Sequence, residues 1–192
     1  AEKKESQGLY ELRAAAALAR TSRLIGAHEE KIVLAAAQLS VRKIREIMIP
    51  ASDISTIPSE ASLSEALIKA HMDMHTRFPG SAKENDPNSI EGYVNFKDII
   101  IAMKIKPLGA NVKAISRPIK RIHVNLEIST AFEQMIREKA HIALIVSEDG
   151  SVVGLITLED IIEELVGDIE DEYDRLPSHI HTYGQTWIVG GG

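Results

Sequence analysis

The chain has 192 residues, 44% of them hydrophobic and 26% charged, which excludes wholesale disorder and predicts a folded globular protein. Its formal net charge of −6 argues against a nucleic-acid-binding surface, because phosphate backbones are bound by clustered lysine and arginine. The chain has no cysteine, which excludes disulfides, thiolate zinc sites and cysteine nucleophiles.

Residues 1–40 predict a helical connector. Two stretches of strong helix formers, 9–19 and 27–39, are separated by Gly26, where one helix is expected to end and the next to begin. No apolar run approaches the roughly 20 residues that a membrane helix needs, and no signal peptide is found. We therefore expect the chain, as given, to be soluble.

Residues 41–106 predict a first α+β unit. Strands are expected at 54–57, 77–79 and 92–95, with helices from Ser62 onward and at 98–103. Pro79 has no backbone N–H, so its strand is expected at an edge or an end of the sheet. His71 and His75 stand four residues apart, a spacing that can hold a metal on a helix face, but no third ligand lies nearby. We expect no metal site.

Residues 107–118, with two prolines and a glycine, predict a linker to a second unit at 119–174. Its expected strands are 119–124, 142–146 and 152–156, its expected turn is 148–150, and its expected helices are 129–138 and a helix from Leu158. The helical positions expected to face inward are Ala131, Met135, Ile136, Leu158, Ile161, Ile162 and Leu165.

The two units are copies of one another. Residues 92–100 match residues 154–162 position for position, 62 residues apart, and residues 56–62 line up with 123–129 at an offset of 67. This predicts two repeats of about sixty residues with the order β-α-β-β-α. Because neither copy buries much apolar surface alone, we expect the two to pack through their sheets into one pseudo-symmetric body with clefts between them.

The second repeat passes directly from a strand to a helix N-terminus. Thr157 is expected to cap this helix, with Asp160 as the acidic half of a capping box. A helix N-terminus suits a phosphate, and a carboxylate in the first turn can accept hydrogen bonds from both hydroxyls of a ribose. The alternative is a plain capped helix. The first repeat has Asn95 and Asp98 at the matching positions.

Paired units ending in this way resemble a tandem of CBS domains, called a Bateman module. The strings Ile47-Met48-Ile49-Pro50, Thr76-Arg77-Phe78-Pro79, Asn95-Phe96-Lys97-Asp98 and Thr157-Leu158-Glu159-Asp160 further resemble the CorC/HlyC family, over roughly residues 41–174. Members of that family are membrane proteins linked to magnesium and cobalt efflux, and they are similar to the eukaryotic cyclin M transporters.

The resemblance implies an α+β fold in which two CBS repeats pack as a pseudo-two-fold module after the helical segment. It implies that residues 175–192 include the start of a further β-rich domain, with a strand from Thr186. It also implies an upstream membrane-spanning domain outside this chain, a place at the cytoplasmic face of the inner (plasma) membrane, and a homodimer formed through the CBS pair.

Paired CBS units bind adenine nucleotides in their clefts, which implies ATP, or AMP, as the ligand here, with Mg²⁺ on the phosphates. Thr157 and Asp160 are the expected phosphate and ribose contacts, and Arg77 is the expected phosphate fork, with a surface ion pair as its alternative. The other expected nucleotide contacts are Ile57, Pro58, Phe78, Pro79, Ile156 and Asn95, and Asp98 marks a weaker second site.

The function expected from the resemblance is a regulatory nucleotide-binding module whose ligand biases a dimer between two arrangements. The alternative is a dimerisation or interaction scaffold with no nucleotide bound. An enzyme is disfavoured because the chain lacks G-x-S-x-G, H-E-x-x-H and P-loop strings. The nine acidic residues within 159–174 predict a solvated helix end, and a Mg²⁺-responsive surface is the alternative interpretation.

Overall fold

The structure is a computed structural model that describes residues 2–84, 86–105, 109–167, 180–183 and 186–189. Its helices are α1 (Glu2–Thr21), α2 (Ala27–Leu39), α3 (Leu63–Asp73), α4 (Phe96–Ile105), α5 (Val112–Ile115), α6 (Ile128–Glu138) and α7 (Leu158–Val166). Its strands are β1 (Ile49–Pro50), β2 (Ile57–Pro58), β3 (Arg77–Ser81), β4 (Ile90–Asn95), β5 (Lys120–His123), β6 (Ile142–Val146), β7 (Val152–Thr157), β8 (Ile180–Tyr183) and β9 (Thr186–Val189). Among these described residues, no helix is both long and apolar enough to cross a membrane.

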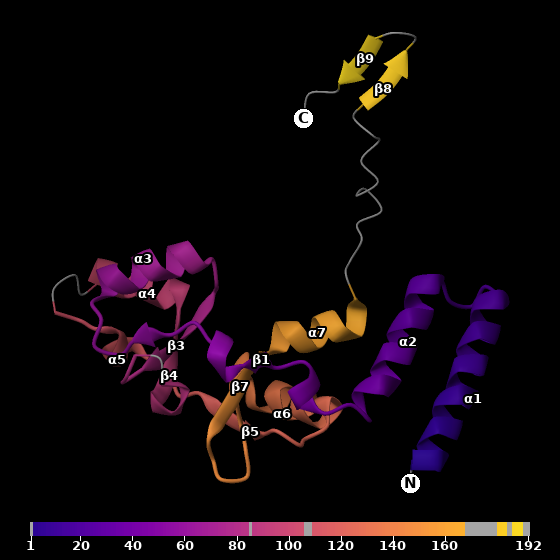
Figure 1. Cartoon of the computed structure of the whole chain (residues 1–192), viewed down its shortest axis with the longest axis horizontal. Helices are drawn as coiled ribbons and strands as arrows, with labels where there is room; N and C mark the ends of the chain where they lie inside the picture. The colour runs from indigo at the N-terminus through magenta and orange to yellow at the C-terminus, as the bar shows by residue number, and fades with distance from the viewer. Residues whose placement is uncertain (1, 85, 106–108, 168–179, 184–185, 190–192) are drawn as a thin grey trace.

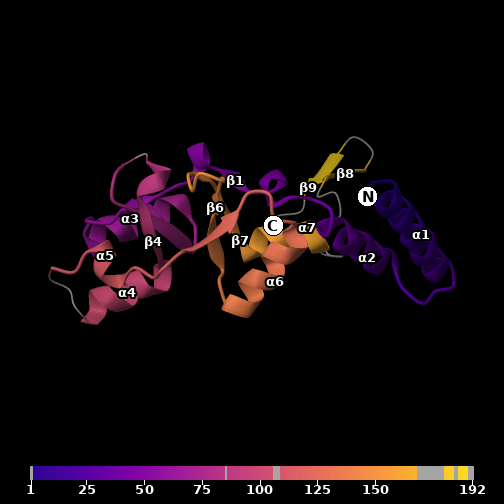
Figure 2. The same ribbon diagram turned by 90° about the horizontal axis from the view of Figure 1, so that it is seen from below.

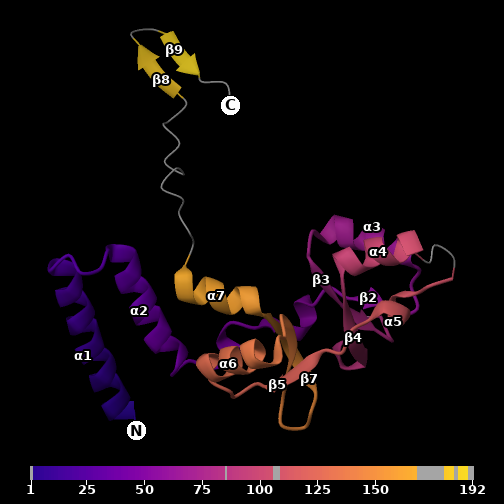
Figure 3. The same cartoon turned by 180° about the vertical axis from the view of Figure 1, so that it is seen from behind.

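The predicted N-terminal helices are confirmed as the antiparallel pair α1 and α2, which stands at one end of the molecule (Figure 1). Gly26 precedes α2 as its N-cap residue, and an ion pair of 2.8 Å between Arg20 and Glu30 joins the two helices. α2 packs against α7 and α6, so the connector rests on the second repeat. The first repeat lies at the opposite end, as Figures 2 and 3 also show.

The predicted order β-α-β-β-α is confirmed in both repeats. In the first, β3 lies between β2, which runs parallel to it, and β4, which runs antiparallel. In the second, β6 lies in the same way between β5 and β7. α3 and α4 cover the core of the first sheet and α6 and α7 that of the second, with Phe78 and Ile156 fully buried in the respective cores. The fold is therefore the expected α+β duplication.

Pro79 lies in a central strand, so the prediction of an edge or an end was wrong. Its partner on β4 is Tyr93, whose backbone N–H and C=O both form hydrogen bonds with Arg117. Pro79 and Tyr93 are therefore a pair of opposite residues that exchange no hydrogen bond. On the other side, β2 pairs only with Gly80 and Ser81. Neither neighbouring strand needs a hydrogen bond from the N–H that Pro79 lacks, so the sheet tolerates a proline at its centre.

The repeats correspond at an offset of 65 residues through their first halves, not 67 as the sequence alignment suggested. α3 begins at Leu63 and α6 at Ile128, and both helices have 11 residues and end in a left-handed residue, Met74 and Lys139 respectively. A shift of two residues keeps every side chain of a strand on the same face, so apolar alternation does not reveal such an error.

The segment ahead of each repeat crosses over to the other repeat. Ile44 is fully buried in the core of the second repeat, and its N–H donates to the carbonyl of Leu126. Val112 is fully buried in the core of the first repeat, and its N–H donates to the carbonyl of Ala61. Part of the stretch predicted as the 107–118 linker is thus the short helix α5, packed on the first core.

The two sheets meet as predicted, through a small apolar cluster. Ile90 of the first repeat packs there with four residues of the second, namely Ile142, Leu144, Val152 and Leu155. The backbone N–H of Val152 also donates to Asn88 Oδ1 at 2.7 Å across this junction. This contact places the edges of both repeats side by side and positions the site.

Smaller differences from the sequence predictions concern exposure and strand length. Ile136 and Ile162 are 52% and 41% exposed, so the prediction that they face inward was wrong. The strand expected at 54–57 is reduced to Ile57 and Pro58. The strand predicted from Thr186 is confirmed as β9, which pairs with β8.

Candidate functional site

A hollow of about 320 Å³ lies between the repeats and is lined by residues of both. The first repeat contributes the residues between α3 and β3 and the start of β3, including Thr76, Arg77 and Pro79. The second contributes the strand-to-helix junction with Thr157 and Asp160. The structure therefore brings Arg77, Pro79, Thr157 and Asp160 together in one cleft, although they are as far as 83 positions apart in the chain, from Arg77 to Asp160.

Thr157 and Asp160 form the predicted capping box at the start of α7. The Thr157 N–H donates to Asp160 Oδ2 at 2.8 Å, and the Asp160 N–H donates to Thr157 Oγ1 at 3.2 Å. This reciprocal pair fixes both side chains at the helix N-terminus, facing the cleft. Within the described residues no hydrogen bond reaches Asp160 Oδ1, so this oxygen can accept a hydrogen bond from a ligand.

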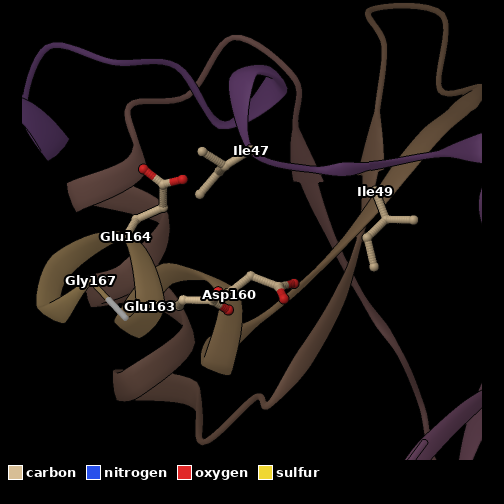
Figure 4. Close-up of a pocket in the computed structure, with 6 residues that line it drawn as sticks. All are labelled: Ile47, Ile49, Asp160, Glu163, Glu164 and Gly167. Carbon is tan, nitrogen blue, oxygen red and sulfur yellow. The ribbon is translucent and has the colours of Figure 1, made fainter. Parts of the chain in front are cut away.

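Asp160 also borders a second hollow, which is lined by residues of α7 and of the crossing segment. Figure 4 shows Asp160, Glu163 and Glu164 on α7, opposite Ile47 and Ile49 of the crossing segment. Ile49 lines both hollows. Asp160 is therefore the carboxylate at which the two hollows meet, and its immediate neighbour across the gap is apolar.

Arg77 forms an ion pair across the cleft. Its Nη1 lies 2.8 Å from Glu159 Oε1, and its side chain is only 17% exposed. The pair connects β3 of the first repeat with the first turn of α7 in the second. A phosphate that binds Arg77 must therefore share this guanidinium with Glu159 or displace it.

The structure does not bring three expected apolar contacts to the cleft. Ile57, Phe78 and Ile156 are at most 1% exposed and belong to the interiors of the repeats. Neighbouring residues of a strand face opposite sides, so Leu155 and Thr157 face the cleft while Ile156 faces the core.

The apolar lining consists instead of side chains that were not among the expected nucleotide contacts. They are Ile49, Ile54, Met74, Ile142 and Leu155. The signal for Leu155 was its position two residues before Thr157, on the same strand face. Pro58 is exposed on β2 and does not line the hollow.

At the matching junction of the first repeat, both expected side chains have partners. Asn95 Oδ1 accepts from the backbone N–H of Lys97 at 2.9 Å. Both carboxylate oxygens of Asp98 are bound by Arg117, whose Nε and Nη2 lie 2.8 and 3.1 Å from them. These hydrogen bonds raise the pKa of Arg117 above its ordinary value. Arg117 was not singled out, because it lies in the predicted linker.

No metal centre is found in the described part of the chain, where no three His, Asp or Glu side chains cluster suitably. α3 ends at Asp73, so His75 leaves the helix and packs against the ring of Phe78 instead of facing His71. Glu164, in the acidic run 159–174, pairs with Arg42. Residues 168–174 of that run lie outside the described residues.

Comparisons with known proteins agree with this architecture. Residues 112–167 match the model of the CBS domain family. The chain is 35% identical over 136 residues to "Magnesium and cobalt efflux protein CorC" of Buchnera aphidicola subsp. Acyrthosiphon pisum, covering 71% of this chain and 46% of that protein. Across such curated relatives the chain spans 30% to 53% of their length.

Two solved structures come from the CBS domain of a bacterial CNNM/CorC family Mg²⁺ transporter. One is 32% identical with a TM-score of 0.75 and covers 84% of this chain and 98% of that chain. The other, a complex with ATP, is 32% identical with a TM-score of 0.68 and covers 73% and 99%. These relatives are named as a Mg²⁺ transporter and a magnesium and cobalt efflux protein, and not as enzymes. The chain is a CBS-domain pair and belongs to the CorC/CNNM family.

Proposed function

We propose that the chain is a regulatory module that binds an adenine nucleotide, ATP or AMP, in the cleft between its two CBS repeats. The observation that carries this proposal is the position of Asp160, which lines a hollow shared by both repeats beside Thr157 and Arg77. The ATP complex of a related CBS domain supports the choice of ligand. ATP is our first choice because Arg77 offers a fork for phosphate.

Each part of a nucleotide has a chemical counterpart in the cleft. The Asp160 carboxylate suits the two ribose hydroxyls, since a carboxylate accepts several hydrogen bonds. The N-terminus of α7, the Thr157 hydroxyl and Arg77 suit the phosphates. Ile54, Ile142 and Leu155 offer apolar surface to the base. Glu159 and Asp53 also line the cleft, so we expect Mg²⁺ to accompany the phosphates and offset these carboxylates.

We further propose that the module regulates a membrane protein of divalent-cation efflux or resistance, acting on magnesium or cobalt. The names of the relatives support this, as does their greater length. In this proposal the module lies at the cytoplasmic face of the membrane and forms a homodimer, and nucleotide binding biases the dimer arrangement. Such coupling requires that the nucleotide bind one arrangement more tightly than the other.

Isothermal titration calorimetry with ATP, ADP and AMP, each with and without Mg²⁺, tests the nucleotide site. We expect binding by the wild type and a loss of at least about tenfold in affinity in Asp160→Asn, because the ribose loses a charged acceptor. Glu133→Gln, an exposed charge change on α6, is the matched control. Circular dichroism would show whether Asp160→Asn keeps its fold despite the altered capping box.

The alternative function is a dimerisation scaffold whose cleft holds no nucleotide. No heat with any adenine nucleotide at millimolar concentration would favour the scaffold over the regulatory module. Equal affinity in Asp160→Asn and the wild type would place the nucleotide elsewhere on the molecule.

A further inference from the structure

The two crossing segments bring different residues to equivalent positions beside the two junction carboxylates. Ile49 pairs with Leu155 in an antiparallel bridge, and Arg117 forms the same kind of bridge with Tyr93, through hydrogen bonds of 2.8 and 2.9 Å. A proline follows in both cases. Position 49, beside the junction with Asp160, therefore corresponds to position 117, beside the junction with Asp98.

Two glycines support this correspondence independently. A side chain at Gly154 would come within 2.6 Å of the Ile49 carbonyl oxygen, and one at Gly92 would come within 2.5 Å of the Arg117 carbonyl oxygen. Gly154 and Gly92 hold the same place in the repeated sequence, two residues after the start of β7 and β4 respectively. Both crossing segments thus approach their strand at the same point, and each brings its side chain toward the junction helix.

The consequence differs sharply between the two junctions. Beside Asp160 the segment places an isoleucine, which makes no hydrogen bond. Beside Asp98 it places a guanidinium that binds both carboxylate oxygens in a fork. A two-pronged arginine–carboxylate pair is among the stronger and more directional contacts available to these groups.

We propose that Arg117 blocks a second nucleotide site at the junction of the first repeat, here called the second cleft, by occupying Asp98, so that the chain binds one nucleotide and not two. This inference rests on the proposed function, because it assigns the same ribose contact to both junction carboxylates. A ribose approaching Asp98 has to displace a charge-assisted pair, whereas a ribose approaching Asp160 displaces only solvent. The residue at position 49 or 117 thereby decides which cleft is open.

The remaining side chains of the second cleft are consistent with this assignment. By the offset of 65 residues between α3 and α6, Ile142 at the start of β6 corresponds to Arg77 at the start of β3, so β6 has no arginine at that position. Asn95 replaces Thr157 and uses its side-chain oxygen to cap α4. When Arg117 is removed, Asp98 is the group that becomes available, and the sugar is the part of the ligand that it would bind.

The test measures binding stoichiometry by calorimetry with adenosine, which carries the diol without phosphates, and with ATP. We expect Arg117→Gln to raise the number of sites per chain from about one to about two. In the double variant Asp160→Asn/Arg117→Gln one site should remain. Adding Asp98→Asn to this double variant should remove that last site. Arg137→Gln, on an arginine that is 74% exposed on α6, is the matched control.

Two sites in the wild type, or an unchanged stoichiometry in Arg117→Gln, would overturn the inference. A loss of ATP affinity in Arg117→Gln would also overturn it, since Arg117 would then be a phosphate ligand. Failure of the proposed function gives a different pattern: Asp160→Asn would leave wild-type binding intact, or the wild type would bind nothing. Even then, a new site in Arg117→Gln that requires Asp98 would support the closure of the second cleft.

Discussion

At the scale of single residues, the cleft is defined by charges that already have partners. Asp160 and Thr157 hold one another at the start of α7, and Arg77 is held by Glu159 from the opposite repeat. The ion pair of Arg77 and Glu159 is partly buried on the arginine side and exposed on the glutamate side. A nucleotide phosphate competes with Glu159 for the same guanidinium, so the two ends of this pair should affect binding in opposite directions.

We therefore expect Glu159→Gln to strengthen ATP binding several-fold and Arg77→Gln to weaken it by about tenfold, because only the second change removes a phosphate contact. Adenosine should bind both variants equally well. Calorimetry with ATP and adenosine on both variants checks this. Glu133→Gln again serves as the control for a lost negative charge. A weaker ATP complex in Glu159→Gln would show that Glu159 acts with the ligand and not against it.

At this scale, the sequence predicts a contact correctly where the contact depends only on residues close together in the chain. The Thr157 and Asp160 capping box follows from their spacing alone, as the structure confirms. It failed for Ile57, Phe78 and Ile156, because which face of a strand is covered by its own helices depends on packing. It also missed Arg117, whose partner Asp98 is 19 positions away and becomes adjacent only when the crossing segment folds back.

At the scale of elements, equivalent helices and strands of the two repeats are joined by different kinds of polar contact. In the first, Ser55, just before β2, donates to Asp73 at the end of α3 at 2.5 Å. In the second, Lys120 at the start of β5 forms an ion pair of 2.6 Å with Glu138 at the end of α6. The two contacts lie at matching places, since the offset of 65 residues relates both pairs. The hydroxyl of Ser55 therefore does for the first repeat what the ammonium of Lys120 does for the second.

The first of these contacts should make stability depend on pH. The Ser55 hydrogen bond holds the pKa of Asp73 below its ordinary value of 3.8. A carboxyl with a lowered folded-state pKa stabilises the fold above its unfolded-state pKa, and that contribution is lost as pH falls through the folded-state pKa. We expect Ser55→Ala to lower the free energy of unfolding by about 1 kcal/mol at pH 7, and this difference to shrink below about pH 4.

Urea unfolding of Ser55→Ala and the wild type between pH 7 and pH 3 measures this difference. Ser52→Ala removes a hydroxyl that donates to the exposed Asp53 and serves as the control. A difference that stays constant over the whole range would mean that Ser55 acts through packing and not through the ionised carboxylate.

Element prediction was accurate because each helix and strand has its own period and end signals. Ser62 and Thr157 cap their helices as expected, and the turn at Gly150 forms with positive φ. The repeat alignment ahead of α3 and α6 was two residues out, because apolar alternation is unchanged by that shift. The short helix α5 was not predicted, since four residues carry too little periodicity to distinguish a helix from a linker.

At the scale of the whole molecule, the crossing segments make each repeat incomplete without the other. Lys43 bridges to Glu127 and Asn111 bridges to Ser62, so each segment enters the partner repeat at the start of its helix. Ile44 and Val112 are then buried in cores that belong, by sequence, to the other half of the chain. No sequence period reports such an exchange, because it depends on which core the segment reaches.

This exchange predicts a crossed pattern of destabilisation. Truncating a fully buried branched side chain to alanine costs about 2–4 kcal/mol, and the loss is felt in the core that the side chain fills. We expect Ile44→Ala to speed backbone hydrogen exchange in β5, β6 and β7 more than in β3 and β4. We expect Val112→Ala to do the reverse, even though Val112 is the first residue of the stretch that matches the CBS family.

Hydrogen exchange followed by mass spectrometry on both variants measures this pattern at the level of peptides. Ile57→Ala, whose side chain is 1% exposed in the first core, is the uncrossed control and should resemble Val112→Ala. If Ile44→Ala instead loosened the first repeat, the segment would belong to the unit that follows it in sequence. Equal acceleration in both repeats would mean that they open together as one unit, because the junction around Leu144 and Ile90 couples their cores more tightly than each core holds itself.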